Sequence, residues 1–289
     1  MISGPSDRRI QLAVTIVQSA PAAFGSEAAL IGSATRGTAD DDSDVDVQFW
    51  VTGKIPNIRA RENWLADIGG TDITADQNER TLACRLGELW LEFAWVPEAD
   101  ETLRIERLRS GESTEREDLV VAASITTAIP LRSSGRLAEW KTALADYPEA
   151  LRERLILETA DFWRFAHRVD APYVLARREE PFLLDHWISA DVRDCLRILC
   201  ALNRCWEPDW KALSTSIDEF LTCPDRLPSR LALIFSSPSL VERAHESRSL
   251  IRDVLRLTAA SFDVRAALDV LERSLIRHAA SGPPPNPMG

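Results

Sequence analysis

Two aspartates and a Gly-Ser pair are the residues of this 289-residue sequence best suited to chemistry. Asp44 and Asp46 alternate with Val45 and Val47, a pattern typical of a half-buried strand. Successive side chains of a strand point to opposite faces, so the two carboxylates share one face. Like charges held this close repel each other unless a cation offsets them. Mg²⁺ takes one or two carboxylates together with substrate phosphates, so the spacing predicts a divalent-metal site.

Gly32 and Ser33 follow a short apolar run, residues 28–31, which predicts that they end a strand. Glycine allows the backbone to turn tightly and to approach a ligand closely. A serine that opens the next turn offers a hydroxyl and backbone N–H groups to a phosphate. A phosphate site beside a metal site is the arrangement that phosphoryl or nucleotidyl transfer requires.

Gly32-Ser33, a short gap, and then Asp44-x-Asp46 inside an apolar strand together resemble the signature of the polymerase-β-type nucleotidyltransferase superfamily. The layout is most similar to that of the small bacterial enzymes that adenylylate aminoglycoside and lincosamide antibiotics. The resemblance implies a co-substrate, ATP or another nucleoside triphosphate, and a small hydroxylated acceptor. It also implies two Mg²⁺ ions bridged to the triphosphate by Asp44 and Asp46.

Glu92 is the third candidate acid. It lies in a second alternating run, residues 88–96, and a carboxylate among aromatic and aliphatic residues is costly to bury unless it is paired or bound to a metal. By resemblance it is the third acid of the superfamily, either a metal ligand or the general base for the acceptor hydroxyl. Glu88 is a rival for the same role. The alternative is that Glu92 faces solvent on an edge strand.

Three cationic residues are candidates for binding nucleotide phosphates. Arg36 could reach a triphosphate, or it could pair with the acidic run at residues 40–42, itself expected to be a solvated loop. Arg204 and Lys211 lie in a stretch that resembles part of the helical domain of such enzymes, and at a helix end they could hold phosphates. The alternative for this stretch is a helix corner with its two tryptophans in the core.

The periodicity predicts an α+β protein: an N-terminal mixed-sheet nucleotidyltransferase domain, residues 1–132, followed by a C-terminal helical bundle, residues 133–280. A Pro-rich disordered tail is expected at residues 281–289. Residues 97–117 are predicted to be an irregular charged loop with a short helix. Residues 119–130 are predicted as a strand, or as a helix and then a strand. The helical periods beyond this point cover residues 136–145, 148–169, 182–206, 210–221, 228–235 and 240–279.

The net charge of −11 argues against a general nucleic-acid binder, which would present a basic face, and suits a cationic small molecule. The five cysteines form no Cys-x-x-Cys pair, which favours free thiols in a reducing cytoplasm. No apolar run is long enough for a membrane span and no signal peptide opens the sequence, so we expect a cytoplasmic protein. We expect a monomer or a homodimer, and the sequence does not decide between the two.

Two other functions fit the same residues. One is a toxin-like nucleotidyltransferase that modifies a protein or a tRNA, although the acidic charge counts against tRNA. The other is a protein that binds a nucleotide without catalysis. A full set of three carboxylates favours catalysis over binding alone.

Overall fold

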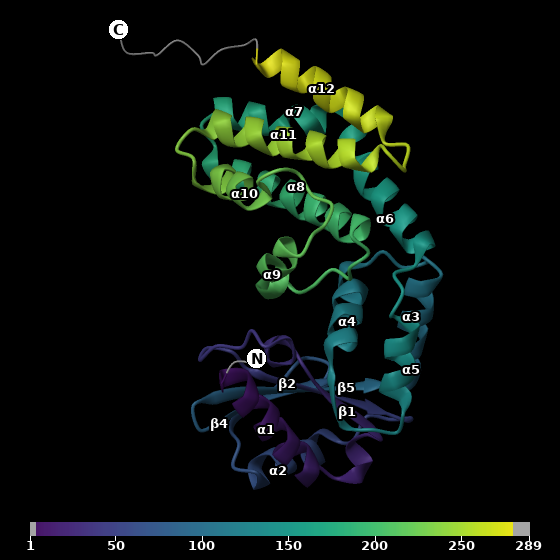
Figure 1. Ribbon diagram of the computed structural model, residues 1–289. Coiled ribbons are helices and arrows are strands. Elements are labelled where there is room, and N and C mark those ends of the chain that lie inside the picture. Colours follow the sequence, from purple (N-terminus) through teal and green to yellow (C-terminus); the bar gives the residue numbers. More distant parts are fainter. Residues whose placement is uncertain (1–3, 280–289) are drawn as a thin grey trace. The chain divides into compact units, whose positions relative to one another are not determined.

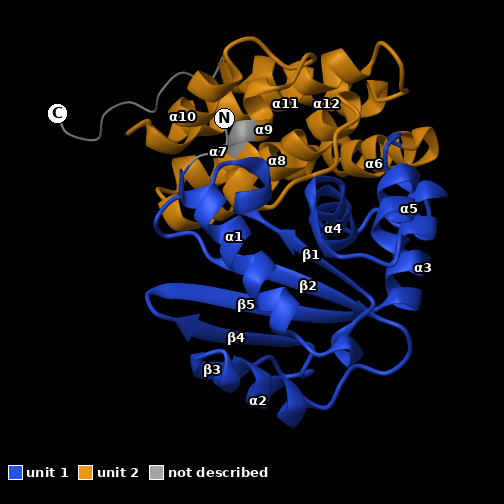
Figure 2. Cartoon of the chain, turned by 60° about the horizontal axis from the view of Figure 1, so that its bottom comes forward, with its two compact units in different colours: residues 1–147 blue, residues 148–289 orange. Residues whose placement is uncertain are grey.

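The computed structural model describes residues 4–279, with the backbone alone for residues 214 and 215. The chain divides into two compact units, one ending at Tyr147 and the other starting at Pro148 (Figure 2). Among the described residues, the strands all belong to the first unit and the second unit is helical. This confirms the α+β class, with a mixed sheet first and helices after it. The predicted domain limits at residues 132 and 133 stay a prediction, and the predicted tail lies outside the described residues.

A single mixed sheet organises the first unit. Its strand order is β3-β4-β5-β2-β1-β6, with β2 and β5 parallel and the other neighbours antiparallel. The strands are β1 (Glu27–Ile31), β2 (Val45–Val51), β3 (Thr71–Ala75), β4 (Thr81–Leu86), β5 (Leu89–Pro97) and β6 (Ile129–Arg132). Since β2 and β5 are parallel neighbours, they begin at the same edge of the sheet.

Helices lie on both faces of this sheet (Figure 1). They are α1 (Gly4–Ser19), α2 (Ile58–Asp67), α3 (Glu98–Arg109), α4 (Arg116–Thr127) and α5 (Arg136–Ala143). The helices α1 and α2 pack on the face that carries the apolar side chains of β2 and β5. On the other face, Trp50 of β2 contacts Trp140 of α5, with ring centroids 5.3 Å apart.

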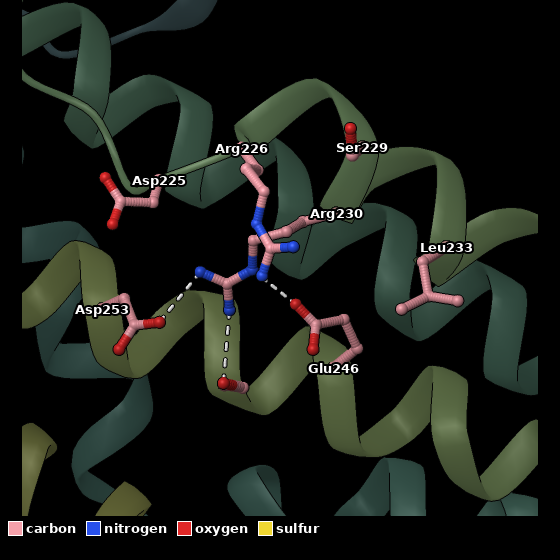
Figure 3. Close-up of a pocket in the computed structure, with 8 residues that line it drawn as sticks. Asp225, Arg226, Ser229, Arg230, Leu233, Glu246 and Asp253 are labelled. Atoms are coloured by element: carbon pink, nitrogen blue, oxygen red, sulfur yellow. Dashed lines mark hydrogen bonds and ion pairs between the residues drawn. The ribbon is translucent and has the colours of Figure 1, made fainter.

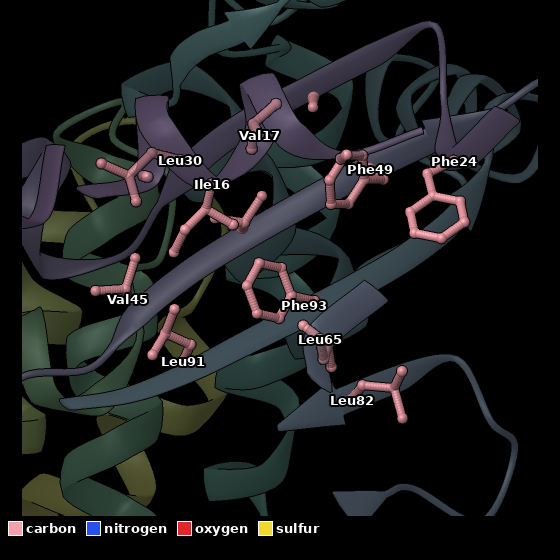
Figure 4. Packing of buried hydrophobic residues seen from close by; sticks show 14 of the residues in the cluster. Ile16, Val17, Phe24, Leu30, Val45, Phe49, Leu65, Leu82, Leu91 and Phe93 are labelled. Carbon is pink, nitrogen blue, oxygen red and sulfur yellow. The ribbon is translucent and has the colours of Figure 1, made fainter. Parts of the chain in front are cut away.

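The core between the sheet and the first two helices follows from the alternation in β2 and β5 (Figure 4). Val45, Val47 and Phe49 are all buried, as are Leu91, Phe93 and Trp95 of β5. Phe49 stacks on Trp95 with ring centroids 5.4 Å apart. Burial of each large apolar side chain contributes about 1.5–3 kcal/mol, so this face fixes the register of both strands.

The second unit is built around a long helix near the C-terminus, α11. Its helices are α6 (Glu149–Asp161), α7 (Ala166–Arg177), α8 (Pro181–Leu202), α9 (Leu213–Asp218), α10 (Leu227–Ser236), α11 (Leu240–Thr258) and α12 (Arg265–Ala279). α11 lies against α7, α8, α10 and α12. Arg248 of α11 forms a fully buried ion pair with Asp191 of α8, and Trp163 Nε1 donates to Asp191 Oδ1 at 2.8 Å. Losing one partner of such a pair costs about 3–5 kcal/mol, because it leaves the other charge buried and uncompensated.

Two sequence predictions need correction, and one choice between two expected patterns is decided. Residues 97–117 are not mainly irregular, because α3 takes up Glu98–Arg109 and buries Ile105 and Leu108. The expected helices over 148–169 and 240–279 are each broken into two. Residues 116–132 form a helix and then a strand, one of the two patterns expected there. Within residues 4–279, no helix has the length and apolar character needed to cross a membrane.

Candidate active site

The site residues of the sheet lie on neighbouring strands. Ile31 at the end of β1 is opposite Asp46 of β2, and Asp46 is opposite Glu92 of β5. Neighbouring strands run about 4.8 Å apart, and directly opposed residues point to the same face. The register therefore brings the turn at Gly32, the Asp46 carboxylate and the Glu92 carboxylate side by side on one face of the sheet.

Gly32 is in direct contact with Asp46. It has φ +83° and ψ −156°, a backbone region that is essentially restricted to glycine. A Cβ at residue 32 would overlap with Asp46 Oδ2 and lie 3.3 Å from Asp46 Cγ. The missing side chain of Gly32 is thus the space that the Asp46 carboxylate occupies, which explains why the turn after β1 needs glycine here.

The three acids differ in exposure. Asp44 and Asp46 are half-buried, while Glu92 is exposed. The suggestion that Glu92 lies on an edge strand is wrong, because β5 is flanked by β4 and β2. Glu88, the rival acid, lies in the turn before β5 and is exposed.

A polar network lies behind the acids on the same face. Gln48, two residues beyond Asp46, is buried, and its Nε2 donates to Glu101 Oε2 at 3.2 Å. Trp50 Nε1 donates to the same oxygen at 3.0 Å. Arg104 completes the network by donating to Glu101 Oε1 at 2.7 Å. Glu101 is fully buried, so this network anchors α3 to the strand that carries the aspartates.

The acidic loop that leads into β2 is held by α1. Arg9 donates from Nε to the carbonyl oxygen of Ser43 at 2.8 Å and from Nη2 to that of Asp41 at 3.3 Å. Ser6 Oγ accepts a hydrogen bond from the Ala39 N–H at 3.2 Å. Arg9 and Ser6 are both buried. The sequence analysis missed these two residues, because an arginine in a surface helix is normally expected to face solvent.

Ser33 and Arg36 bound a short 3-10 turn, η2 (Ser33–Arg36), directly after Gly32. Both side chains are half-buried, and Thr35 Oγ1 donates to the Gly32 carbonyl oxygen at 2.9 Å, which braces the turn. The acidic run at residues 40–42 is exposed, as expected of a solvated loop. The two roles weighed for Arg36, phosphate contact and pairing with this run, stay open.

The carboxylates fit a magnesium site of the kind completed by its substrate. Among the described residues, no three or more His, Cys, Asp or Glu side chains are grouped so that they could hold a metal ion. Mg²⁺ usually has only one or two protein carboxylates, the rest of its ligands being water and phosphate oxygens. The pair Asp44 and Asp46 meets that requirement, and the metal role of Glu92 stays a prediction.

Arg204 and Lys211 belong to the second unit. Arg204 Nη2 donates to Glu149 Oε2 at 2.9 Å, and both side chains are largely exposed. Lys211 is exposed in the 3-10 turn η4 (Trp210–Ala212). Trp210 is 46% exposed, so the alternative of a corner with both tryptophans in the core is wrong for this residue. The phosphate-binding role of the two cations stays a prediction.

Trp90 lies on the face of the sheet that carries Asp46 and Glu92, and the sequence analysis gave this residue no role. It lies two residues before Glu92 on β5, so both side chains are on the same face, and it is 48% exposed. The Arg85 guanidinium lies over the ring, 5.8 Å from its centroid. A half-exposed indole beside a candidate general base offers a flat surface to an acceptor, and its position in an alternating strand is the signal that could have identified it.

A polar cavity of about 370 Å³ lies in the second unit, between α10 and α11 (Figure 3). Its central residue, Arg230, forms ion pairs with Glu246 and, at 2.8 Å, with Asp253. Arg230 Nη2 also donates to Ser249 Oγ at 3.2 Å. Because Arg230 is already satisfied by two carboxylates, we interpret this cavity as an interhelical ion-pair network.

Comparison with known proteins adds little to this geometry. No protein-family model matches the chain, and no curated protein does. Among solved structures, the chain is similar to a nucleotidyltransferase-like protein from Exiguobacterium sibiricum 255-15, with 12% identity and a TM-score of 0.40 over 94% of this chain and 80% of that chain. At this level of similarity the match carries no argument about family or activity, and a function has to be argued from the site itself.

Proposed function

We propose that this protein is a Mg²⁺-dependent nucleotidyltransferase that transfers AMP from ATP to a hydroxyl group of a small acceptor of the aminoglycoside type. The observation that carries the proposal is the contact between Gly32 and the Asp46 carboxylate, in register with Glu92. Here a backbone turn requires glycine to accommodate a carboxylate, and a second carboxylate lies next to it on the neighbouring strand. This arrangement suits a site where a triphosphate and its metal ions are held close to the backbone.

The chain's own residues would share the work as follows. Asp44 and Asp46 would hold the Mg²⁺ ions, which supply charge neutralisation on the triphosphate. Ser33, at the start of the turn beside Asp46, would hydrogen bond to the terminal phosphates, with Arg36 assisting from the same turn.

Glu92 would act as the general base. Its carboxylate would take the proton from the acceptor hydroxyl as the acceptor oxygen bonds to the α-phosphorus of the nucleotide. The bond from that phosphorus to the bridging oxygen breaks, and pyrophosphate leaves with the electron pair. The exposure of Glu92 supports this role, because the acceptor has to reach the base from solvent.

The test is pyrophosphate release from ATP and Mg²⁺ with a panel of aminoglycosides and lincosamides. Asp46→Asn is expected to lower release by at least about 100-fold, the scale of losing a preorganised electrostatic contact to the transition state. Asp41→Asn is the matched control, because Asp41 is an exposed member of the neighbouring acidic loop, and it should retain release within about twofold. Equal activity of the two variants would refute the proposed role of Asp46.

A further inference from the structure

Two cysteines meet at the C-terminal end of α8. The Cys205 N–H donates to the Cys200 carbonyl oxygen at 3.0 Å, and the Arg204 N–H donates to the Ala201 carbonyl oxygen at 3.2 Å. Arg204 has φ +54°, in the left-handed region. These are the hydrogen bonds and the backbone conformation of a Schellman motif. In this motif the side chain after the turn packs on the side chain five residues earlier, so the helix end itself places Cys205 against Cys200.

The side chains of this pair interact as the motif predicts. Cys205 Sγ donates to the Cys200 carbonyl oxygen at 3.5 Å, which holds the Cys205 thiol at the residue that carries the Cys200 thiol. Cys200 is only 2% exposed, while Cys205 is half-buried. The hydrogen bond from Cys200 lowers the pKa of the Cys205 thiol, and the same bond, together with burial, raises the pKa of Cys200. Cys205 is thus the thiol that ionises first and that an oxidant reaches first.

We propose that Cys200 and Cys205 are a redox-active dithiol that a peroxide converts into a disulfide across the C-terminal cap of α8. The Cys205 thiolate attacks one oxygen of hydrogen peroxide, the O–O bond breaks, and hydroxide leaves with the electron pair to become water on protonation. The sulfur of Cys200 then attacks the sulfenic acid of Cys205, the S–S bond forms, and a second water leaves. Two thiols are oxidised and one peroxide is reduced.

The other three cysteines lack this arrangement. Cys84 and Cys195 are buried, and burial raises the pKa of both thiols. Cys223 is half-buried, and its thiol makes a local hydrogen bond, with Sγ 3.9 Å from the Phe220 carbonyl oxygen. Cys223 nevertheless follows a turn that is attached to the end of α8, so it is the competitor that an experiment has to exclude.

The disulfide would close a ring that includes Asn203 and Arg204, and both of these residues contact other segments of the second unit. Asn203 Nδ2 donates to the Thr222 carbonyl oxygen at 2.8 Å, and the Thr222 N–H donates to Asn203 Oδ1 at 2.8 Å. Arg204 forms the ion pair with Glu149 at the start of α6. Oxidation would therefore rigidify the corner at which α8, α6 and the turn at Thr222 are joined. This consequence does not depend on the proposed catalytic activity.

The experiment treats the reduced full-length chain with one equivalent of hydrogen peroxide, then counts thiols after denaturation and maps disulfides by trypsin digestion. The five thiols should fall by two. Trypsin cleaves after Arg197, Arg204 and Lys211, so the peptides 198–204 and 205–211 should remain joined and should separate on reduction with dithiothreitol.

Matched variants identify the pair. Cys223→Ser should still lose two thiols and give the same joined peptides, whereas Cys205→Ser should lose none. The proposal is overturned if the wild type keeps all five thiols, or if the joined peptides contain Cys223. Peptide mapping of the wild type gives this answer even if Cys205→Ser fails to fold.

Discussion

Gly32→Ala perturbs the contact between the turn after β1 and the Asp46 carboxylate. Alanine at φ +83° and ψ −156° occupies a region that costs about 1–3 kcal/mol. Its Cβ also overlaps with Asp46 Oδ2, so the carboxylate has to leave its rotamer, at about 0.5–1.5 kcal/mol more. We expect the free energy of unfolding to fall by about 1.5–4.5 kcal/mol, the sum of these two effects.

A double-mutant cycle with Asp46→Ala separates the two costs. Removal of the carboxylate relieves the overlap but leaves the backbone strain, so Gly32→Ala should cost about 1 kcal/mol less in the Asp46→Ala background. Gly53→Ala is the control for strain alone, because Gly53 has φ +95° and no atom within 4 Å of an added Cβ. The assay is urea unfolding followed by tryptophan fluorescence, with pyrophosphate release measured in parallel.

The prediction for turnover is equally specific. Gly32→Ala should abolish most pyrophosphate release, since it displaces the carboxylate expected to hold the metal ions, whereas Gly53→Ala should keep it. Additive effects of Gly32→Ala and Asp46→Ala on stability, combined with near-normal release in Gly32→Ala, would refute the contact and the role built on it.

Three further predictions concern single residues. Burial raises the pKa of Asp194 to about 6 from 3.8. The protonated carboxyl therefore contributes fully to stability below about pH 4, and this contribution is lost as the pH rises through about 6. Relative to the wild type, the free energy of unfolding of Asp194→Asn in urea should be about 1–3 kcal/mol higher at pH 8 and unchanged at pH 4. Glu101→Ala should cost about 2–6 kcal/mol in the same assay, because the buried Gln48 and Trp50 donors lose their acceptor, while Arg104 keeps its hydrogen bond to Asp118. A loss below about 1 kcal/mol would contradict the network. Glu92→Gln should lower turnover by about 10²–10⁴-fold while calorimetry finds ATP binding unchanged, and turnover near that of the wild type would remove Glu92 as the base.

Strands β2 and β5 were predictable from the sequence because one face of each is buried. Val45, Val47 and Phe49 alternate with polar residues, and the structure buries all three of them. Helix α3 was not predictable in the same way. Its charged residues suggest a solvated loop, yet Glu101 is fully buried because donors from β2 satisfy it. Those donors come from a distant segment, so no local pattern reveals them.

Part of the candidate site could also not be predicted from the sequence. The residue types and spacing identified Gly32, Asp46 and Glu92 as candidates, but the adjacency of Asp46 and Glu92 depends on the parallel pairing of β2 with β5, which joins segments far apart in the chain. Arg9 is a similar case, because its buried contacts with the acidic loop exist only after α1 has packed on the sheet. Long-range register and buried charge satisfaction are tertiary properties, which explains why local periodicity missed them.

Nucleotidyl transfer is tested most directly by mass spectrometry of the acceptor after incubation with ATP, Mg²⁺ and the wild-type chain, beside Asp46→Asn. We expect one compound of the panel to gain a single nucleoside monophosphate with the wild type, and this product to be lost with Asp46→Asn. No nucleotidylated product with any acceptor, together with ATP binding that is the same for both proteins, would contradict nucleotidyl transfer at this site.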